Sequence, residues 1–342
     1  MTQIINWGII GLGNVALKFA EAFKDSNNSK LKAVSSNTED KINKFQKKFN
    51  IAKDYCFNKY EDLLDCKEID IVYIALPNSM HKEWVRKSIE RKKNILIEKP
   101  AFIDLSQTEN IKKKINDYNL FFSEGFIYRY SPQILEILEL LKNNTIGEPK
   151  SMVSNYGTNL LTKKNIFGLI KKKKINNNNR LYNKKLGGGA ILDLGCYPVS
   201  LSMLVASTIS KIDCEKIRVV DKIKEMGSSK VDVNSHARIE FENGFVSDVN
   251  TSFSKEIGKE TVIIGSEGLL KIVNPWQIDP PTIILEGKIN KKIEIECAKN
   301  IFLYQINNIS KNLLEGKSKP DFPGVSINET IELTKILNKW LN

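Results

Sequence analysis

The sequence is poor in the residues that build metal centres and disulfide frameworks. It has only two histidines, His81 and His236, and five widely spaced cysteines, Cys56, Cys66, Cys196, Cys214 and Cys297. Zinc sites need clustered Cys and His ligands, and disulfide-bonded secreted proteins show cysteines in pairs. We therefore expect no metal site, reduced thiols and a cytoplasmic protein.

Long apolar runs are also missing. No stretch reaches the eighteen consecutive apolar residues that a membrane-spanning helix needs. The chain enters a predicted strand at Ile4 without a charged-then-apolar leader. These absences predict a protein that neither enters a membrane nor is exported.

A stripe of basic residues with interleaved aromatics, which is typical of nucleic-acid binding, is absent as well. The formal net charge of +12 comes from lysines scattered among many Asn and Ile residues. No nucleic-acid partner is expected. A cationic surface still attracts small phosphorylated or carboxylated molecules.

The chain has 342 residues, which is long enough for two domains. Its first third shows a repeating pattern of strands and helices. Apolar strands are predicted at 4–10, 31–35, 69–75, 94–97 and 120–123, and helices at 39–49, 79–91 and 105–118. Such alternation is typical of a parallel sheet covered by helices on both faces. Residues 1–124 are predicted to form a Rossmann domain of the α/β class.

The first strand ends in a glycine turn. The turn and the start of the next helix read Gly11-Leu12-Gly13-Asn14-Val15-Ala16. Glycines allow the tight turn and let backbone N–H groups approach a pyrophosphate, and Ala16 lets the helix pack closely on the strand. The strand, turn and helix context predicts dinucleotide binding.

The end of the second strand bears on which dinucleotide is bound. An acidic residue there would bind the ribose hydroxyls of NAD, but this chain has Ser36 and Asn37, with Lys41 one turn later. Hydroxyls and an ammonium group suit a 2′-phosphate, so NADP is favoured over NAD. The same segment is also suited to helix capping, with Thr38 as the N-cap of the helix from Glu39.

Two further strand ends carry polar or turn residues. One reads Leu76-Pro77-Asn78, and the other reads Glu98-Lys99-Pro100. Ligands of open parallel sheets bind beyond the carboxyl ends of the strands. We expect these residues to border the same ligand as the glycine turn.

Residues 125–342 are predicted to form a second, α+β domain with a large, mostly antiparallel open sheet. Its strands are expected at 150–156, 231–241, 245–253, 260–264, 269–273, 282–286 and 291–296, and its helices at 132–142, 301–315 and 328–341. The terminal helix, 328–342, is a candidate for packing back on the first domain. The basic, low-complexity segment 161–179 is either a mobile loop or a lid over the substrate.

A second chemical motif lies within this domain. The segment Gly189-Ala190-Ile191-Leu192-Asp193-Leu194-Gly195-Cys196-Tyr197-Pro198 follows a run of glycines. Asp193 and Tyr197 are four residues apart and share a face if the segment is helical. Together with Lys99 they would supply a proton-transfer group, a cation that tunes it and an acceptor that orients substrate.

These motifs, in this order, resemble the glucose-fructose oxidoreductase and inositol dehydrogenase family (Gfo/Idh/MocA), closest to its dihydrodiol dehydrogenase and xylose dehydrogenase branch. The resemblance spans nearly the whole chain. Besides the motifs above, it includes His81, Glu124 to Arg129 with Pro132, Gly265 to Gly268, and Pro275-Trp276. It implies hydride transfer between NAD(P) and the hydroxyl or carbonyl carbon of a sugar, polyol or related diol, and a homodimer or higher homo-oligomer.

Position by position, the resemblance implies that Lys99, Asp193 and Tyr197 are catalytic. It places His81, Tyr128 and Arg129 near the cofactor, although His81 is better suited to holding the strand-end loop, and Arg129 is equally suited to a structural ion pair. Arg180 and Trp276 are candidate substrate contacts; Trp276 is alternatively a packed aromatic.

Two questions stay open at this point. Tyr197 is the favoured proton-transfer group, with Lys99 lowering its pKa, but Lys99 itself is the alternative. A catalytically silent dinucleotide-binding sensor is the alternative to an enzyme.

Overall fold

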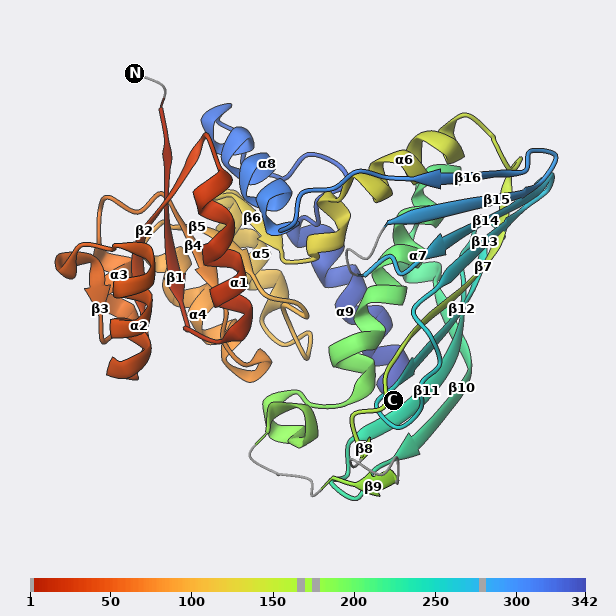
Figure 1. Ribbon diagram of the computed structural model, residues 1–342, viewed down its shortest axis with the longest axis horizontal. Coiled ribbons are helices and arrows are strands. Elements are labelled where there is room, and N and C mark those ends of the chain that lie inside the picture. The colour runs from red at the N-terminus through yellow and green to blue at the C-terminus, as the bar shows by residue number, and fades with distance from the viewer. Residues whose placement is uncertain (1–2, 165–169, 174–178, 277–280) are drawn as a thin grey trace. The chain divides into compact units, whose positions relative to one another are not determined.

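The computed structural model describes residues 3–164, 170–173, 179–276 and 281–342 (Figure 1). The chain forms two compact units. The first comprises Met1–Ser131 with Ala298–Ile331, and the second comprises Pro132–Cys297 with Glu332–Asn342. The division differs from the predicted domains 1–124 and 125–342 mainly because the segment from 298 to 331 belongs to the first unit. The terminal helix, α9 (Ile327–Leu341), is divided between the units after Ile331.

The first unit is built on a six-stranded parallel sheet in the order β3-β2-β1-β4-β5-β6, which is the Rossmann order. All five strand pairs run parallel. The strands are β1 (Ile5–Ile10), β2 (Ser29–Ser35), β3 (Cys56–Phe57), β4 (Ile71–Ile74), β5 (Asn94–Ile97) and β6 (Phe122–Glu124). The predicted Rossmann sheet is thus confirmed.

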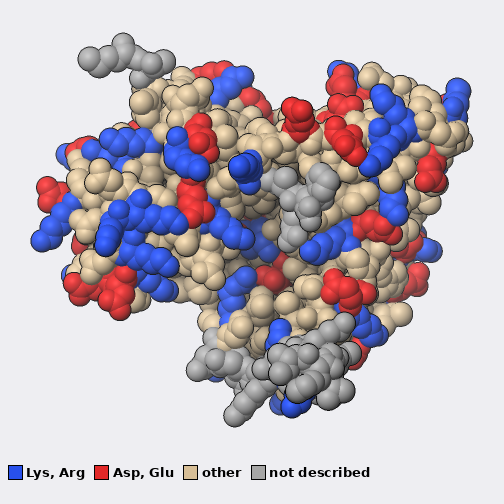
Figure 2. Space-filling model, in the orientation of Figure 1, with Lys and Arg blue, Asp and Glu red and all other residues tan. Residues whose placement is uncertain are grey.

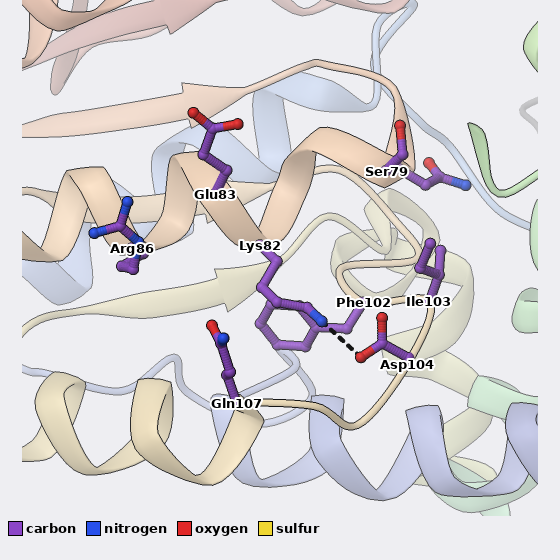
Figure 3. Close-up of a pocket in the computed structure, with 9 residues that line it drawn as sticks. Ser79, Lys82, Glu83, Arg86, Phe102, Ile103, Asp104 and Gln107 are labelled. Atoms are coloured by element: carbon purple, nitrogen blue, oxygen red, sulfur yellow. Dashed lines mark hydrogen bonds and ion pairs between the residues drawn. The ribbon is translucent and has the colours of Figure 1, made fainter. Parts of the chain in front are cut away.

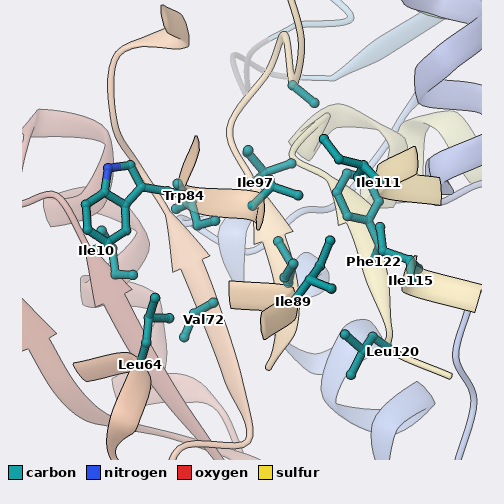
Figure 4. Close-up of a cluster of buried hydrophobic side chains, with 14 of the residues drawn as sticks. Ile10, Leu64, Val72, Trp84, Ile89, Ile97, Ile111, Ile115, Leu120 and Phe122 are labelled. Carbon is teal, nitrogen blue, oxygen red and sulfur yellow. The ribbon is translucent and has the colours of Figure 1, made fainter. Parts of the chain in front are cut away.

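Helices cover both faces of this sheet. On one face pack α3 (Tyr60–Asp65), α4 (Asn78–Glu90), α5 (Thr108–Asp117) and the start of α9; Figure 4 shows this cluster. On the other pack α1 (Asn14–Ala22), α2 (Glu39–Phe49) and α8 (Phe302–Leu314). Neighbouring strand residues alternate between the faces: Ile9 joins one cluster and Ile10 the other.

Helix α8 joins the first unit because its apolar face completes this core. Phe302, Ile306 and Ile309 are buried in the same cluster as Trp7 and Phe19. The sequence order gave no hint of this, since α8 follows all the strands of the second unit.

The second unit is built on an eight-stranded sheet in the order β10-β11-β12-β7-β13-β14-β15-β16. Only the β12 and β7 pair is parallel, so the predicted mostly antiparallel sheet is confirmed. The strands are β7 (Pro149–Gly157), β10 (Arg218–Met226), β11 (Asp232–Glu240), β12 (Val246–Ser252), β13 (Thr261–Gly265), β14 (Gly268–Val273), β15 (Thr282–Gly287) and β16 (Lys291–Glu294). Strand β10 was not predicted, because this edge strand is largely exposed and lacks apolar alternation.

Helices α6 (Pro132–Lys142) and α7 (Cys196–Ile209) belong to this unit, and α7 packs on β7 and β12. The helical stretch Lys184–Ile209, which ends with α7, is long and apolar enough to cross a membrane, with a mean hydropathy of 1.5, but 94% of its apolar window is buried inside the protein. This is the burial of a core helix. It lets α7 carry apolar residues all round without exposing them.

The basic segment 161–179 is only partly described. Strands β8 (Thr162–Lys164) and β9 (Ile170–Lys172) pair as a small antiparallel sheet. Residues 165–169 and 174–178 lie outside the described residues. The choice between a mobile loop and a lid therefore stays a prediction.

Basic and acidic side chains are interspersed on the face of the molecule in Figure 2. Elsewhere in the described residues, partly exposed basic side chains form ion pairs, such as Lys87 with Glu61 and Arg91 with Asp65. Much of the positive charge is therefore locally compensated.

Candidate active site

The glycine turn between β1 and α1 packs closely against the end of β4. Gly11 has a φ of +90°, and a Cβ there would lie 2.6 Å from the carbonyl oxygen of Ala75. At Gly13 a Cβ would meet nothing within 4 Å. Helix α1 starts at Asn14 with neither a side-chain cap nor an acidic residue in its first turn. Its positive end and N–H groups therefore suit an anion.

The other residues predicted to bind the cofactor at this turn differ in their exposure to solvent. Leu12 is buried beneath the turn, whereas Gly13, Asn14 and Val15 are exposed at the start of α1, Val15 unusually so for an apolar residue at 41%. These residues fit a bound dinucleotide.

The end of β2 presents the residues predicted to select the cofactor. Asn37 and Lys41 are exposed, while Ser36 is buried and its hydroxyl accepts a hydrogen bond from the Thr38 N–H at 3.2 Å. Thr38 is the N-cap of α2, but its side chain makes no capping hydrogen bond. Thr38 therefore occupies the N-cap position, as the capping alternative expected, but its hydroxyl does not cap the helix.

His81 ties two strand-end loops together. Its ring is fully buried; Nδ1 lies 3.0 Å from the carbonyl oxygen of Pro100, and Nε2 lies 2.8 Å from that of Leu76. These contacts support the interpretation that His81 holds the loop at the ends of β4 and β5. They place Leu76, Pro77 and Asn78 beside the Glu98-Lys99-Pro100 segment within the first unit.

Glu98 and Lys99 follow directly after β5 and are half-buried. The Tyr73 hydroxyl on β4 donates a hydrogen bond to Glu98 Oε1. Tyr73 is itself fixed by stacking on Phe19 of α1, at a centroid distance of 4.0 Å. Glu98 is thereby held to β4, whose Tyr73 in turn packs on α1.

Tyr128 and Arg129 are buried, with exposed fractions of 0% and 1%. Arg129 donates to Glu329 at 2.7 Å, to the Pro323 carbonyl at 3.3 Å and to the Tyr128 hydroxyl at 3.1 Å. These contacts favour the structural ion pair for Arg129. Its predicted place beside the nicotinamide stays a prediction, as does that of Tyr128.

In the second unit, the glycine run before the Asp193 motif is shaped by Asp232. Gly189 has a φ of +120°, and a Cβ there would lie 2.2 Å from Asp232 Oδ1. The same carboxylate accepts the Ile191 N–H at 2.7 Å, and burial raises the pKa of Asp232. Asp232, which was not predicted from the sequence, thus holds the backbone at Gly189 and Ile191, where the motif begins.

The motif itself starts as a π-helical turn, Ile191–Gly195, and continues as α7. Trp340 packs on Gly195, where a Cβ would lie 2.8 Å from its ring. Such turns are frequent at functional sites. The segment is helical, as expected; that Asp193 and Tyr197 share one face of it stays a prediction.

Asp193 is paired with Arg180. Arg180 Nη1 lies 2.9 Å from Asp193 Oδ1, and the two side chains are 45% and 11% exposed. The structure therefore joins two of the predicted site residues of this unit.

Tyr197 belongs to an aromatic cluster with Trp276 and Tyr156. The Tyr197 ring meets Trp276 edge-on at 5.6 Å and Tyr156 at 5.2 Å, while Tyr156 and Trp276 stack at 5.5 Å. The Trp276 Nε1–H donates to the Asn155 carbonyl at 3.0 Å. Tyr156 was missed because an aromatic in a strand is ordinarily a packing residue.

A pocket of about 300 Å³ lies between α4 and the loop after Pro100 (Figure 3). Lys82 crosses it to pair with Asp104 at 2.6 Å. It is lined by Asn78, Ser79, Lys82, Glu83, Arg86, Phe102, Ile103, Asp104 and Gln107. Of the predicted site residues, Asn78 lines this pocket.

Within the described ranges, no group of three or more His, Cys, Asp or Glu side chains is arranged to hold a metal ion. The four cysteines whose side chains are described, Cys56, Cys66, Cys196 and Cys297, form no disulfide bond with one another.

Two family models match this chain. The model for the "Oxidoreductase family, NAD-binding Rossmann fold" matches residues 5–126, and the model for the "GFO/IDH/MocA C-terminal domain" matches residues 134–271. Together they span well over half of the sequence. The chain belongs to the Gfo/Idh/MocA oxidoreductase family. It is thus a member of a family of NAD(P)-dependent oxidoreductases, as its motifs indicated.

Curated relatives agree with the predicted branch of the Gfo/Idh/MocA family. The trans-1,2-dihydrobenzene-1,2-diol dehydrogenase of Xenopus laevis is 26% identical over 287 residues, covering 83% of this chain and 80% of that protein. The D-xylose 1-dehydrogenase (NADP(+)) 2 of Haloferax volcanii is 24% identical over 274 residues, covering 80% and 77%.

Solved structures share the fold over almost the whole length. The aldose-aldose oxidoreductase of Caulobacter crescentus, complexed with glycerol, has a TM-score of 0.84 at 18% identity, covering 99% of this chain and 97% of that one. A 3-ketoreductase of Actinomadura kijaniata in complex with NADP and TDP-benzene has a TM-score of 0.82 at 20% identity, covering 98% and 96%.

Proposed function

We propose that this member of the family transfers hydride between NADP(H) and the hydroxyl or carbonyl carbon of a sugar, polyol or related diol. The observation that carries the proposal is the position of Lys99 at the carboxyl end of β5. The same sheet contains β1, whose glycine turn leads into α1, an uncapped helix suited to a dinucleotide. The relatives named above act on a dihydrodiol and on xylose.

NADP is preferred over NAD on two grounds. The end of β2 offers Ser36, Asn37 and an exposed Lys41 in place of an acidic residue, and an ammonium group favours a 2′-phosphate. The xylose dehydrogenase relative is named for NADP(+).

The bound nicotinamide would supply or accept the hydride. We assign proton exchange with the substrate hydroxyl to Tyr197. The Lys99 ammonium would stabilise negative charge that develops on the substrate oxygen, and Asp193 would orient a neighbouring substrate hydroxyl. Proton transfer by Lys99 itself is the alternative assignment.

The aromatic cluster supports a ring-shaped or otherwise flat substrate. Tyr156 and Tyr197 are partly exposed and are backed by the buried Trp276, and the apolar face of a sugar or diol could pack on their rings. Arg180, paired with Asp193, is assigned to the same substrate region.

We further propose a cytoplasmic homodimer or higher homo-oligomer. One face of the eight-stranded sheet carries exposed Val153, Ile223 and Ile264, and exposed apolar residues on an open sheet suit a subunit interface. Light scattering coupled to size exclusion would give the mass; a monomer at micromolar concentration would contradict this proposal.

The decisive assay follows NADPH oxidation and NADP reduction with a panel of sugars, polyols, diols and dicarbonyls. Lys99→Met and Tyr197→Phe should each lower kcat by about 10²- to 10⁴-fold, the range of general acid–base catalysis, while NADPH still quenches tryptophan fluorescence. Turnover that survives both substitutions together would contradict the assignment. A chain that binds NADPH but turns over no substrate would favour a sensor.

A further inference from the structure

Glu124, the last residue of β6, is a fully buried acid that the mechanism above does not use. Its Oε1 accepts the Ala101 N–H at 2.9 Å, and its Oε2 accepts the Thr330 hydroxyl at 2.8 Å. Both of its carboxylate oxygens are thus engaged inside the first unit.

The next residue, Gly125, contacts the other end of the same strand-end segment. Its N–H donates to the Ile97 carbonyl at 2.7 Å. A Cβ at Gly125 would lie 2.9 Å from that oxygen and 3.4 Å from the Glu98 Cα. Two consecutive residues therefore bracket Glu98-Lys99-Pro100, Gly125 before it and Glu124 after it.

Within this bracket, one peptide group is held at both of its polar atoms. The Pro100 carbonyl oxygen faces His81 Nδ1 at 3.0 Å, and the N–H of the following Ala101 donates to Glu124. A peptide plane fixed on both sides has little freedom to rotate. Lys99 is separated from that fixed plane only by Pro100, whose ring fixes its own φ.

Burying a carboxyl group in this place costs free energy. A residue that served only for packing would not need to be an acid. Burial raises the pKa of Glu124 to about 7, against the two hydrogen bonds it accepts; Arg129 on the neighbouring 3-10 turn lowers the pKa, and Glu329 on α9 raises it. A buried apolar residue would avoid this cost but would leave the Ala101 N–H without an acceptor.

We propose that Glu124 is a positioning residue for Lys99: its carboxyl oxygen anchors the Ala101 N–H and so fixes where the Lys99 side chain starts. The inference rests on the proposed role of Lys99 in catalysis. It assigns to Glu124 no contact with substrate or cofactor.

The test compares Glu124→Met, which removes the acceptor, with Glu124→Gln, which keeps an oxygen for Ala101. Thr330→Val is the matched control, because it removes the other hydrogen bond to the same carboxyl group. Each variant is assayed for kcat and KM, for NADPH affinity by fluorescence, for hydrogen exchange of the Ala101 amide, and for the acylation rate of Lys99 by mass spectrometry.

Glu124→Met should lower kcat by about ten- to a hundredfold, as misplacement of a reacting group does, with NADPH affinity within about threefold. The Ala101 amide should lose protection and the acylation rate of Lys99 should change. Glu124→Gln and Thr330→Val should stay within about threefold of wild type in kcat.

Wild-type Ala101 that exchanges as fast as an unstructured peptide would overturn the proposal, whether or not the variants fold. So would a folded Glu124→Met with unchanged kcat and unchanged Lys99 acylation. Exchange and acylation need no substrate. They therefore decide the role of Glu124 even if no turnover is found and the proposed function fails.

Discussion

Arg180 and Asp193 form an ion pair of 2.9 Å in which the carboxylate is the shielded partner, 11% exposed against 45% for the guanidinium. Arg180, which pairs with the proposed catalytic residue Asp193, is thus the more exposed partner, and it directly follows the basic segment 161–179. Its removal tests whether Asp193 depends on it.

Arg180→Gln should lower kcat/KM by about two- to fivefold, the effect of a partly exposed ion pair, because Asp193 loses one of the contacts that orient it. Steady-state kinetics on the best substrate of the panel would measure the change. Lys185→Gln, an exposed cation in the same segment, should leave kcat/KM unaltered. An equal loss in both variants would point to general electrostatic attraction instead.

Lys41→Gln should weaken NADPH binding by about tenfold, since one charge-assisted contact to the 2′-phosphate contributes on the order of 1.5 kcal/mol. NADH binding should not change. Fluorescence titration with both cofactors measures the two affinities. Lys44→Gln, one turn further along α2, is the control; if it has the same effect as Lys41→Gln, Lys41 has no specific role.

Gly189→Ala should be strongly destabilising, because the residue has a φ of +120° and its new Cβ would strike Asp232 Oδ1. Gly244→Ala is the matched control, with a φ of +82° but open space around its Cβ. The control should cost about 1 kcal/mol through backbone strain alone, and Gly189→Ala at least twice as much. Urea unfolding would compare them; equal losses would mean that Asp232 moves aside freely.

Glu124 should make stability fall as pH rises. Its pKa is about 7 in the folded protein against an ordinary 4.5, so between these values the folded protein retains a proton that the unfolded chain releases. The loss starts near pH 4.5, is complete above about pH 7 and is on the order of 3 kcal/mol.

Glu124→Gln does not titrate and should lack this loss. The stability of Glu124→Gln relative to wild type should therefore rise by about 2 kcal/mol from pH 5 to pH 8, measured by denaturant unfolding. Glu109→Gln, an exposed acid of the same unit, should show no such trend. A pH-independent difference for Glu124→Gln would contradict the raised pKa.

The sequence predicted those parts of the fold that follow from local patterns. Helices 39–49 and 132–142 and strand 94–97 begin and end where expected, because apolar periodicity and flanking turn residues mark them. The glycine turn and the Asp193 motif were recognisable for the same reason: their chemistry lies within a few consecutive residues.

Features that depend on distant contacts could not be predicted. Tyr156 on β7 meets Tyr197 on α7 because the helix packs on that strand. Glu124 meets Ala101 because β6 pairs with β5. The local sequence of Tyr156 is that of an ordinary strand, and Glu124, although part of the family motif from Glu124 to Arg129, gives no sign there of its contact with Ala101. The grouping of α8 with the first unit is likewise a matter of which apolar face it completes.

The burial of Trp7 against α8 also bears on how the chain folds during synthesis. The Trp7 Nε1–H donates to the Ser310 hydroxyl at 2.9 Å, a contact between residues 303 positions apart. A ribosome must therefore make nearly the whole protein before α8 can complete the cover that α1 and α2 begin on this face of the first sheet. Until then the part of the apolar cluster that α8 covers stays accessible, and such late long-range contacts favour slow folding and chaperone binding of the nascent chain.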